Sequence, residues 1–264
     1  MTEYLNKIIQ GDCLEVMRGM PDKCVDLVVT SPPYDNLRDY KGYTFDFEGI
    51  AQQLTRVLKD GGVIVWVVAD ATVNGSETGT SFRQALYFKD VCGLNLHDTM
   101  IYGKIGCTTP QCVVVRYDQA FEYMFVFSKG VPKTMNIKCG DGTGRVIKKT
   151  QRKANRENEF YTGFYNEGTA PEPNIFVYKN GASTYSERYV KKHPAVFPEK
   201  LAKDHILSWS NPGDIVLDCL SGSGTTCKMA KLTNRQFIGI EISEEYCEIA
   251  RQRLDKTYYN EEMF

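Results

Sequence analysis

A short run of residues near the amino terminus, Thr30 to Tyr34, has the composition of a site that binds a flat amine. It follows an apolar run, Val25 to Val29, so the pattern indicates a loop at the end of a buried strand. The two prolines fix φ and remove backbone donors, so the loop presents carbonyl oxygens and few N–H groups. Ser31 Oγ and the Pro32 carbonyl could therefore accept hydrogen bonds from an amine.

The exocyclic amine of a nucleobase is a group that such a loop suits. Its lone pair is delocalised into the ring, and it becomes nucleophilic only when acceptors draw on its N–H bonds and bend it towards sp³ geometry. Tyr34 could stack on a base that has left the duplex, which is worth about 1–3 kcal/mol per base. The expected catalytic residues are Ser31, Pro32, Pro33 and Tyr34. An ordinary strand-to-loop turn can contain the same residues, so a second motif is needed.

The second motif has the pattern of a strand, a glycine turn and a helix start. Residues 214–218 form a short, mostly apolar strand that ends in Asp218, and the following turn contains Gly222 and Gly224. These glycines let the backbone come close to a ligand, and Asp218 could hold a ligand amine. The motif therefore predicts a small-molecule site at the end of this strand.

The next predicted strand, residues 236–240, ends in Glu241, a carboxylate placed to bind both hydroxyls of a ribose. We expect Thr225 or Thr226 to cap the helix between the two strands. A dinucleotide-binding Rossmann unit is the competing interpretation, but Cys227 replaces the third glycine of that fingerprint. No other part of the chain indicates hydride chemistry.

With both motifs present, the chain resembles an amino-methylating DNA methyltransferase of the β arrangement, the N4-cytosine/N6-adenine group that uses S-adenosylmethionine. The resemblance rests on motif order, because the loop Ser31 to Tyr34 precedes the loop Asp218 to Thr226, the reverse of most methyltransferases. It covers nearly the whole chain. It implies an α/β, Rossmann-like methyltransferase fold with a mainly parallel, doubly wound sheet, a circularly permuted motif order and an inserted target-recognition region. Double-stranded DNA is the implied substrate.

The resemblance also implies which residues bind the cofactor. Asp12 would contact the adenine, although a turn aspartate is an equal alternative, and residues 193–198 would cover the methionine end. The implied cofactor-binding residues are Asp12, Cys13, Phe197, Asp218, Leu220, Gly222, Ser223, Gly224, Thr225, Thr226 and Glu241. The family usually has Pro and Phe where Cys219 and Leu220 stand, so we expect an altered cofactor affinity. Cys219 lies in the wrong loop to be a nucleophile for carbon-5 methylation, and the chain has no Pro-Cys pair.

Positive charge gathers in the middle of the chain, although the formal net charge is only −1. Residues 133–156 contain eight basic side chains that only Asp141 opposes locally, which suits contact with phosphates. The expected DNA-binding residues are Lys133, Arg145, Lys148, Lys149, Arg152, Lys153 and Arg156. A few of them could read base edges, but a basic run more often faces phosphates.

The expected organisation is one domain with an insertion: residues 1–130 as the catalytic half, 131–190 as the target-recognition region and 191–264 as the cofactor-binding half. Its 264 residues are enough to bury a large core. The nine cysteines show no CxxC pair, which argues against a disulfide framework and a metal site. We expect a cytoplasmic protein of bacterial, archaeal or phage origin, without a signal peptide or membrane segment.

Two further segments have specific expectations. Residues 121–130 resemble the family's strand beside the target base, although an apolar strand needs no function to explain it. A final helix is predicted from Ser243 to about Asp255, with Ser243 as its cap. Arg251 and Arg253 near its end suit the helix dipole, so the helix is expected to be purely structural.

The base that is methylated is left open by the sequence. A serine at the first loop position is commoner in enzymes that resemble N4-cytosine methylases, so cytosine is favoured and N6-adenine is the alternative. Three rival classes are kept as alternatives: a methyltransferase for RNA or protein, which the motif order and the basic insertion disfavour, a nucleotide-cofactor oxidoreductase, and a catalytically inactive DNA-binding subunit, which the presence of Ser31, Tyr34, Asp218 and Glu241 disfavours. A second copy of the chain and a restriction endonuclease are further candidate partners.

Overall fold

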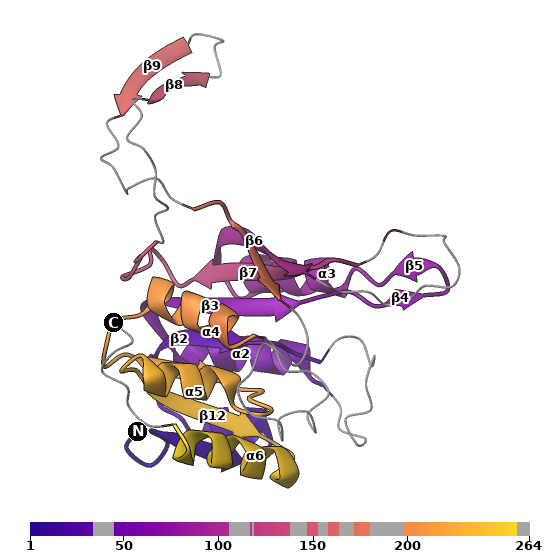
Figure 1. The fold of residues 1–264 in the computed structure, drawn as a ribbon, viewed down its shortest axis with the longest axis vertical. Coiled ribbons are helices and arrows are strands. Elements are labelled where there is room, and N and C mark those ends of the chain that lie inside the picture. The colour runs from indigo at the N-terminus through magenta and orange to yellow at the C-terminus, as the bar shows by residue number, and fades with distance from the viewer. Residues whose placement is uncertain are drawn as a thin grey trace. The chain divides into compact units, whose positions relative to one another are not determined.

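The computed structural model describes residues 1–33, 45–105, 117, 119–137, 147–152, 158–163, 172–179 and 198–257. The chain forms two compact units (Figure 1). Unit 1 joins Met1–Met135 with Asn174–Phe264, and unit 2 is Asn136–Pro173.

Unit 1 is built on an eight-stranded sheet with the order β1-β12-β11-β2-β3-β7-β6-β10. The strands are β1 Lys7–Gln10, β2 Val25–Thr30, β3 Leu58–Val68, β6 Asn95–Ile105, β7 Phe121–Ser128, β10 Ile175–Lys179, β11 Ile215–Asp218 and β12 Gln236–Glu241. Neighbouring strands pair in parallel, except that β7 runs antiparallel to both β3 and β6. The expected mainly parallel sheet is confirmed.

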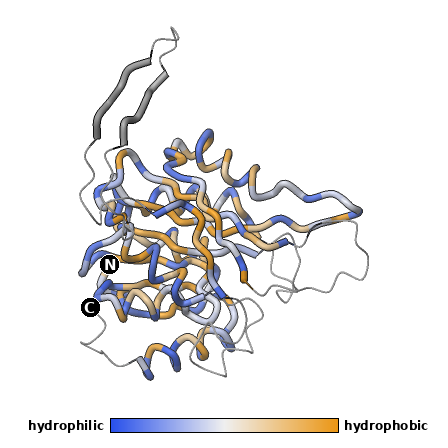
Figure 2. Tube along the Cα trace, turned by 45° about the horizontal axis from the view of Figure 1, so that its top comes forward, coloured by the Kyte–Doolittle hydropathy of each residue, from blue (hydrophilic) through white to orange (hydrophobic). Residues whose placement is uncertain are grey.

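Helices cover both faces of this sheet. They are α1 Cys13–Arg18, α2 Phe47–Val57, α3 Thr80–Leu86 with a π-helical turn at Tyr87–Val91, α4 Glu199–Trp209, α5 Thr225–Leu232 and α6 Glu244–Asp255. Along β2, Leu27 and Val29 pack into a core shared with α4, α5 and α6, whereas Val25 and Val28 pack into a core shared with α1 and α2. Burial on both faces explains why the strand is mostly apolar, and it confirms a doubly wound sheet. Figure 2 shows the hydrophobic strands inside the more polar helices.

Helix α2 shows how local sequence places these layers. Asp46 caps it by accepting a hydrogen bond of 3.0 Å from the Gly49 N–H. Its buried residues, among them Ile50, Leu54 and Val57, lie on one side at helical spacing. The helix, which lies between the predicted catalytic loop and β3 in the sequence, therefore turns an apolar stripe towards the sheet.

Two small hairpins complete the described structure. In unit 1, β4 Thr72–Val73 and β5 Ser76–Glu77 are joined by Asn74 and Gly75, which both have positive φ, as a tight hairpin turn requires. In unit 2, β8 Ile147–Arg152 pairs antiparallel with β9 Asn158–Gly163. The edge strand β10 lies within the range 131–190 but belongs to the sheet of unit 1.

In the described part of the chain, no helix has the length and apolar character needed to cross a membrane. The same residues contain no group of three or more histidine, cysteine, aspartate or glutamate side chains that could hold a metal ion.

Candidate active site

The two motifs leave the sheet at the same edge, from adjacent parallel strands. β2 pairs with β11 so that Leu27 lies opposite Val216 and Val28 opposite Leu217. The loops that begin at Ser31 and Cys219 therefore emerge side by side. The chain goes from β2 to β3 on one side of this pair and from β11 to β12 on the other side, so the strand order changes direction between β2 and β11. Such a switch point is where open α/β sheets bind their ligands.

Buried hydrogen bonds join the two strand ends. Thr30 Oγ1 donates to Asp218 Oδ1 over 2.8 Å, and Thr226 Oγ1 donates to the Val29 carbonyl over 3.1 Å. All three side chains are almost completely buried. Sequence reasoning included Thr30 in the first motif but gave it no role, because threonine is an ordinary residue in a strand. Only its contact with Asp218 shows that it connects the two loops.

Asp218 occupies an environment that disfavours its charge. Burial raises the pKa of its carboxyl group to about 6, and the nearby Glu241 carboxylate adds to the rise. Hydrogen bonds from Thr30, Thr226 and the Leu220 N–H oppose it. A bound cation or N–H donor would stabilise the charged form. Such an environment is compatible with the predicted binding of a ligand amine by Asp218.

Glu241 lies at the end of β12 and supports the glycine loop directly. Its Oε2 accepts a hydrogen bond of 2.9 Å from the Gly222 N–H, and its Oε1 accepts one of 2.8 Å from the Ser243 N–H. Burial raises the pKa of Glu241, and these N–H groups oppose the rise. Each carboxylate oxygen can accept a second hydrogen bond. Glu241 can thus support the loop and also bind ribose hydroxyls.

The glycine loop has a backbone that other residues rarely adopt. Gly222 and Gly224 have φ values of +48° and +75°, in the left-handed region. A Cβ atom on Gly224 would also lie 2.8 Å from Cβ of Ala250 in α6. The Ser221 N–H donates to the Ile240 carbonyl over 2.9 Å, which ties the loop to β12. Both glycines are therefore required by backbone geometry.

The expectation that Thr225 or Thr226 caps α5 is wrong. The helix begins at Thr225 and its N-cap is Gly224, so both threonines lie inside the first turn. Their hydroxyl groups bind elsewhere: Thr226 donates to Val29, and Thr225 accepts from Arg253. They connect α5 to its neighbours and do not cap it.

The missing third glycine is replaced by a glycine on the opposing strand. Cys227 of α5 packs over Gly239 of β12, where a Cβ atom would lie 2.8 Å from Cys227 Sγ and 2.5 Å from Ile8 Cδ1. The absent side chain of Gly239 therefore gives α5 the close approach to the sheet that a third loop glycine gives a Rossmann unit.

Cys219 has the properties of a structural cysteine. Its side chain is buried, and its Sγ lies 4.0 Å from Thr30 Oγ1. Burial raises the pKa of its thiol well above the usual value. Because the thiolate is the nucleophilic form, this environment agrees with excluding Cys219 as a nucleophile.

Asp12 and Cys13 lie at the end of β1, next to Glu241. Gln10 is the partner of Glu241 across the two strands, and the Gly11 N–H donates to the Glu241 carbonyl over 3.0 Å. Asp12 caps α1 by accepting from the Leu14 N–H over 2.8 Å. Burial raises the pKa of the Cys13 thiol to about 12. Asp12 thus has a capping role, and both residues follow the strand end that lies next to Glu241.

The catalytic loop is described only at its start. Pro32 is buried, and Ser31 and Pro33 are half-buried. Tyr34 and Phe197 lie outside the described residues. Leu220 packs partly buried against the core on the α1 and α2 side.

The predicted DNA-binding residues are distributed between the two units. Lys133 lies in unit 1, where its N–H donates to the Gly61 carbonyl over 2.9 Å, near the amino end of β3. Lys148, Lys149 and Arg152 belong to β8 of unit 2, and Arg145, Lys153 and Arg156 lie outside the described residues. Gly61 and the carboxyl end of β3 at Val68 are seven residues apart, roughly 23 Å along a strand. Lys133 is thus not brought to the edge of the catalytic loop.

Asp70, which sequence reasoning did not single out, and Tyr123, which lies in the predicted segment 121–130, are next to the carboxyl end of β3. Asp70 follows β3 and accepts hydrogen bonds from the Ser81 N–H over 2.9 Å and from Thr78 Oγ1 over 3.3 Å. Tyr123 lies opposite Val68 in the pairing of β7 with β3. Burial raises the pKa of Tyr123, and the Asp70 carboxylate contributes. Residues 121–130, expected beside the target base, thus begin at this edge.

Comparison with known proteins agrees with this arrangement. The model of a DNA methylase family matches residues 25–252. The orphan methyltransferase M.BamHII of Bacillus amyloliquefaciens is 53% identical over 249 residues, which cover 88% of this chain and 89% of that protein. The type II methyltransferase M.SmaI of Serratia marcescens is 29% identical over 291 residues, covering 94% and 90%.

Solved structures share the fold. The PvuII cytosine-N4-specific DNA methyltransferase aligns with a TM-score of 0.69 at 22% identity, over 97% of this chain and 87% of its own. The complex of M1.HpyAVI with SAM aligns with a TM-score of 0.61 at 24% identity, over 94% and 99%.

Proposed function

The chain belongs to the DNA methylase family and is a site-specific DNA methyltransferase of its N4/N6 type, and from this premise we propose that it methylates the N4 amine of cytosine. The methyl group comes from S-adenosylmethionine, and the target base is flipped out of double-stranded DNA. The observation that supports the proposal is the contact of Thr30 with Asp218, which joins the ends of the two strands that lead to Ser31 and to the glycine loop.

The residues at the carboxyl edge fit S-adenosylmethionine. The buried Asp218 carboxylate suits the amino group of its methionine part, and Glu241, one strand further, suits the ribose hydroxyls. The left-handed Gly222 and Gly224 bring the backbone close to the ligand. When bound, S-adenosylmethionine supplies a methyl group that its sulfonium has already activated.

The protein's own contribution is to position and polarise the amine. Ser31 Oγ and the Pro32 carbonyl accept hydrogen bonds from the two N–H groups of the amine, and Tyr34 stacks on the flipped base. The amine nitrogen is thereby held in line with the methyl group, so no covalent link to the protein is needed. Ser31 at the first position favours cytosine, and a cytosine-N4-specific enzyme stands among the structures of the same fold. N6-adenine is the alternative.

We assign DNA contact to the basic part of the insertion. The side chains proposed to meet phosphates are Arg145, Lys148, Lys149, Arg152, Lys153 and Arg156. A homodimer and a restriction endonuclease partner remain predictions, which sedimentation and co-purification would test.

The decisive experiment is to incubate the purified protein with unmethylated double-stranded DNA and S-adenosylmethionine and to analyse the nucleosides by mass spectrometry. N4-methyldeoxycytidine is expected. N6-methyldeoxyadenosine would overturn the assignment of the base and leave the rest of the proposal standing. Cofactor binding without any methylated nucleoside would favour an inactive DNA-binding subunit, and binding of NAD in place of S-adenosylmethionine would favour an oxidoreductase. A Ser31→Ala variant that methylates at the wild-type rate would contradict the role of the loop.

A further inference from the structure

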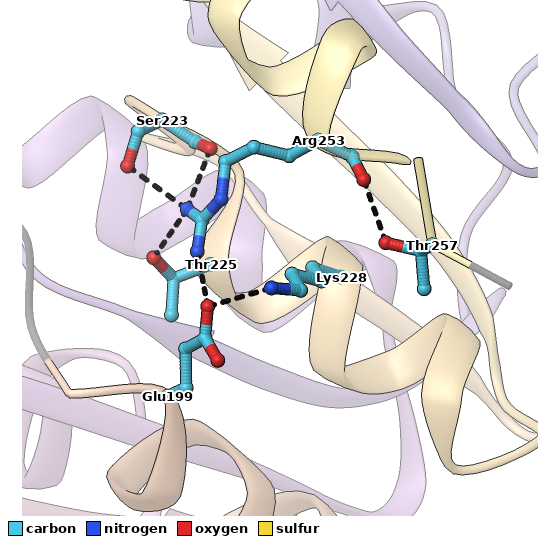
Figure 3. A network of polar contacts seen from close by, with 6 residues as sticks. All are labelled: Glu199, Ser223, Thr225, Lys228, Arg253 and Thr257. Atoms are coloured by element: carbon cyan, nitrogen blue, oxygen red, sulfur yellow. Dashed lines mark hydrogen bonds and ion pairs between the residues drawn. The ribbon is translucent and has the colours of Figure 1, made fainter. Parts of the chain in front are cut away.

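Arg253 joins three segments that are far apart in the sequence (Figure 3). It lies in the last turn of α6, and its side chain is completely buried. Its Nη1 donates to the Ser223 carbonyl over 2.9 Å, to Ser223 Oγ over 3.2 Å and to Thr225 Oγ1 over 3.0 Å. Its Nη2 donates to Glu199 Oε1 over 2.6 Å. One guanidinium thus connects α6, the glycine loop and the start of α4.

The contact with Glu199 explains how the charge of Arg253 can be buried. A buried guanidinium is costly unless it is paired and hydrogen-bonded. Lys228 of α5 donates to the same Oε1 atom over 2.8 Å, and its side chain is 8% exposed. Glu199 therefore stabilises two cations at once. With Nη2 on Glu199, the planar fork of Arg253 directs Nη1 towards the loop.

The contact between Arg253 and Ser223 matters because Ser223 lies in the middle of the glycine loop. Ser223 stands between Gly222 and Gly224, two residues with unusual backbone freedom. On one side, the Gly222 N–H is held by Glu241. On the other, the Ser223 carbonyl is held by Arg253. The loop is thus fixed from both sides, and the second support comes from Arg253, a residue outside both predicted motifs.

We propose that Arg253 is a positioning residue for the cofactor: by binding Ser223 and Glu199, it holds the glycine loop in its binding conformation. The inference rests on the proposed function, in which this loop binds S-adenosylmethionine. Because Arg253 acts through the loop, its loss raises the KM for S-adenosylmethionine and leaves the KM for DNA unchanged.

The experiment compares three variants of the full chain. Arg253→Met removes the guanidinium and keeps much of the apolar volume. Arg253→Lys retains the charge but, as a single ammonium group, cannot reproduce the planar fork. Arg251→Met is the matched control, because Arg251 lies in the same helix and its Nη2 donates instead to the Ile8 carbonyl over 3.2 Å.

Three quantities are measured: the Kd for S-adenosylmethionine by calorimetry, amide hydrogen exchange of residues 219–226 in the ligand-free protein, and the KM for DNA in the methylation assay. Arg253→Met is expected to raise the Kd at least tenfold and to speed up exchange in the loop, with an unchanged KM for DNA. Arg253→Lys should give intermediate values, and Arg251→Met should match the wild type.

A folded Arg253→Met protein with wild-type Kd and loop exchange would overturn the inference. So would equal losses in Arg253→Met and Arg251→Met that follow their melting temperatures. If Arg253→Met does not fold, Arg253→Lys decides by the same measurements of Kd and loop exchange. If the wild type does not bind S-adenosylmethionine, the proposed function fails, and loop exchange in the ligand-free variants still decides whether Arg253 holds the loop.

Discussion

Thr30 Oγ1 donates a hydrogen bond of 2.8 Å to Asp218 Oδ1, across two adjacent strands and 188 positions of sequence. The threonine ends the strand that leads to the catalytic loop, and the aspartate ends the strand that leads to the glycine loop. The bond is buried, so water cannot replace either partner. Together with the pairing of β2 and β11, it fixes the starts of the two loops relative to each other.

Replacing Thr30 with valine keeps the shape of the side chain and removes the donor. We expect the free energy of unfolding to fall by about 1–3 kcal/mol, because Asp218 loses a buried hydrogen bond. Methylation should slow as the two loops lose their common contact. Urea unfolding and single-turnover rates measure the two effects. Thr30→Ser keeps the hydroxyl and should remain close to wild type. Identical values for Thr30→Val and wild type would contradict the role of the bond.

Cofactor binding should depend on the protonation of Asp218. Its pKa of about 6 refers to the protein without ligand, and the amino group of the cofactor prefers the carboxylate form. Affinity is thus expected to be constant above about pH 7 and to fall roughly tenfold per unit below pH 6. Calorimetry between pH 5 and 8 measures it. Asp218→Asn should bind more weakly with a flat profile, and a flat wild-type profile would contradict this assignment.

The same carboxyl group should affect stability in the opposite direction. Its pKa is raised on folding, so the folded protein binds the proton more tightly than the unfolded chain does. The contribution of this group to stability is complete below about pH 4 and is lost as the pH rises through about 6, by up to roughly 3 kcal/mol. The difference in unfolding free energy between Asp218→Asn and wild type should therefore shift in favour of the variant from pH 4.5 to pH 7. A constant difference would argue against a raised pKa.

Gly239→Ala tests the close approach of α5 to the sheet. The added methyl group would meet Cys227 Sγ at 2.8 Å and Ile8 Cδ1 at 2.5 Å, so overpacking should cost about 1–3 kcal/mol. Adding Cys227→Ala and Ile8→Val to Gly239→Ala should restore part of the lost melting temperature. If the two added changes lower it further, the clash is not the cause.

The salt dependence of the Kd for DNA should distinguish basic residues that contact phosphates from those that do not. Changing Lys148 and Lys149 to alanine should weaken DNA binding for all sequences and reduce the slope of log Kd against log salt by about 1 for each phosphate that the variant no longer neutralises. Lys133→Ala is the control, because Lys133 pairs with Gly61 near the amino end of β3. Fluorescence anisotropy at several salt concentrations measures this. An effect of Lys133→Ala as large as that of the β8 variants would instead indicate that DNA contacts the sheet near the amino end of β3.

Local patterns predicted much of the fold. The apolar runs around Val28 and Leu217 indicated buried strands, and both are strands of the parallel sheet. Glycines at 222 and 224 indicated a tight turn, which their left-handed φ values confirm. These predictions succeed because burial and backbone conformation are largely set by residue type and by near neighbours.

Other features were not predictable because they depend on a partner from a distant segment. Arg253 does lie in the last turn of α6, as expected, but the helix dipole did not predict that its side chain is buried against Ser223 and Glu199. Thr225 and Thr226 looked like caps, but the helix begins one residue too early for that. The guanidinium of Arg253 and the hydroxyl groups of the two threonines can each bind many kinds of partner. The sequence does not show which of these partners the fold brings close.

The sequence by itself determined the order of the motifs and the residue types that carry the proposed chemistry: a Ser-Pro-Pro-Tyr loop before a glycine loop, two carboxylates at strand ends, and a basic insertion. Tertiary structure alone decided how these parts meet, through the bond of Thr30 to Asp218, the space above Gly239 and the contact of Arg253 with the loop. The reason is physical. Residue types and short-range spacing fix what a segment can do, whereas contacts across tens or hundreds of residues depend on which strands pair and in which register.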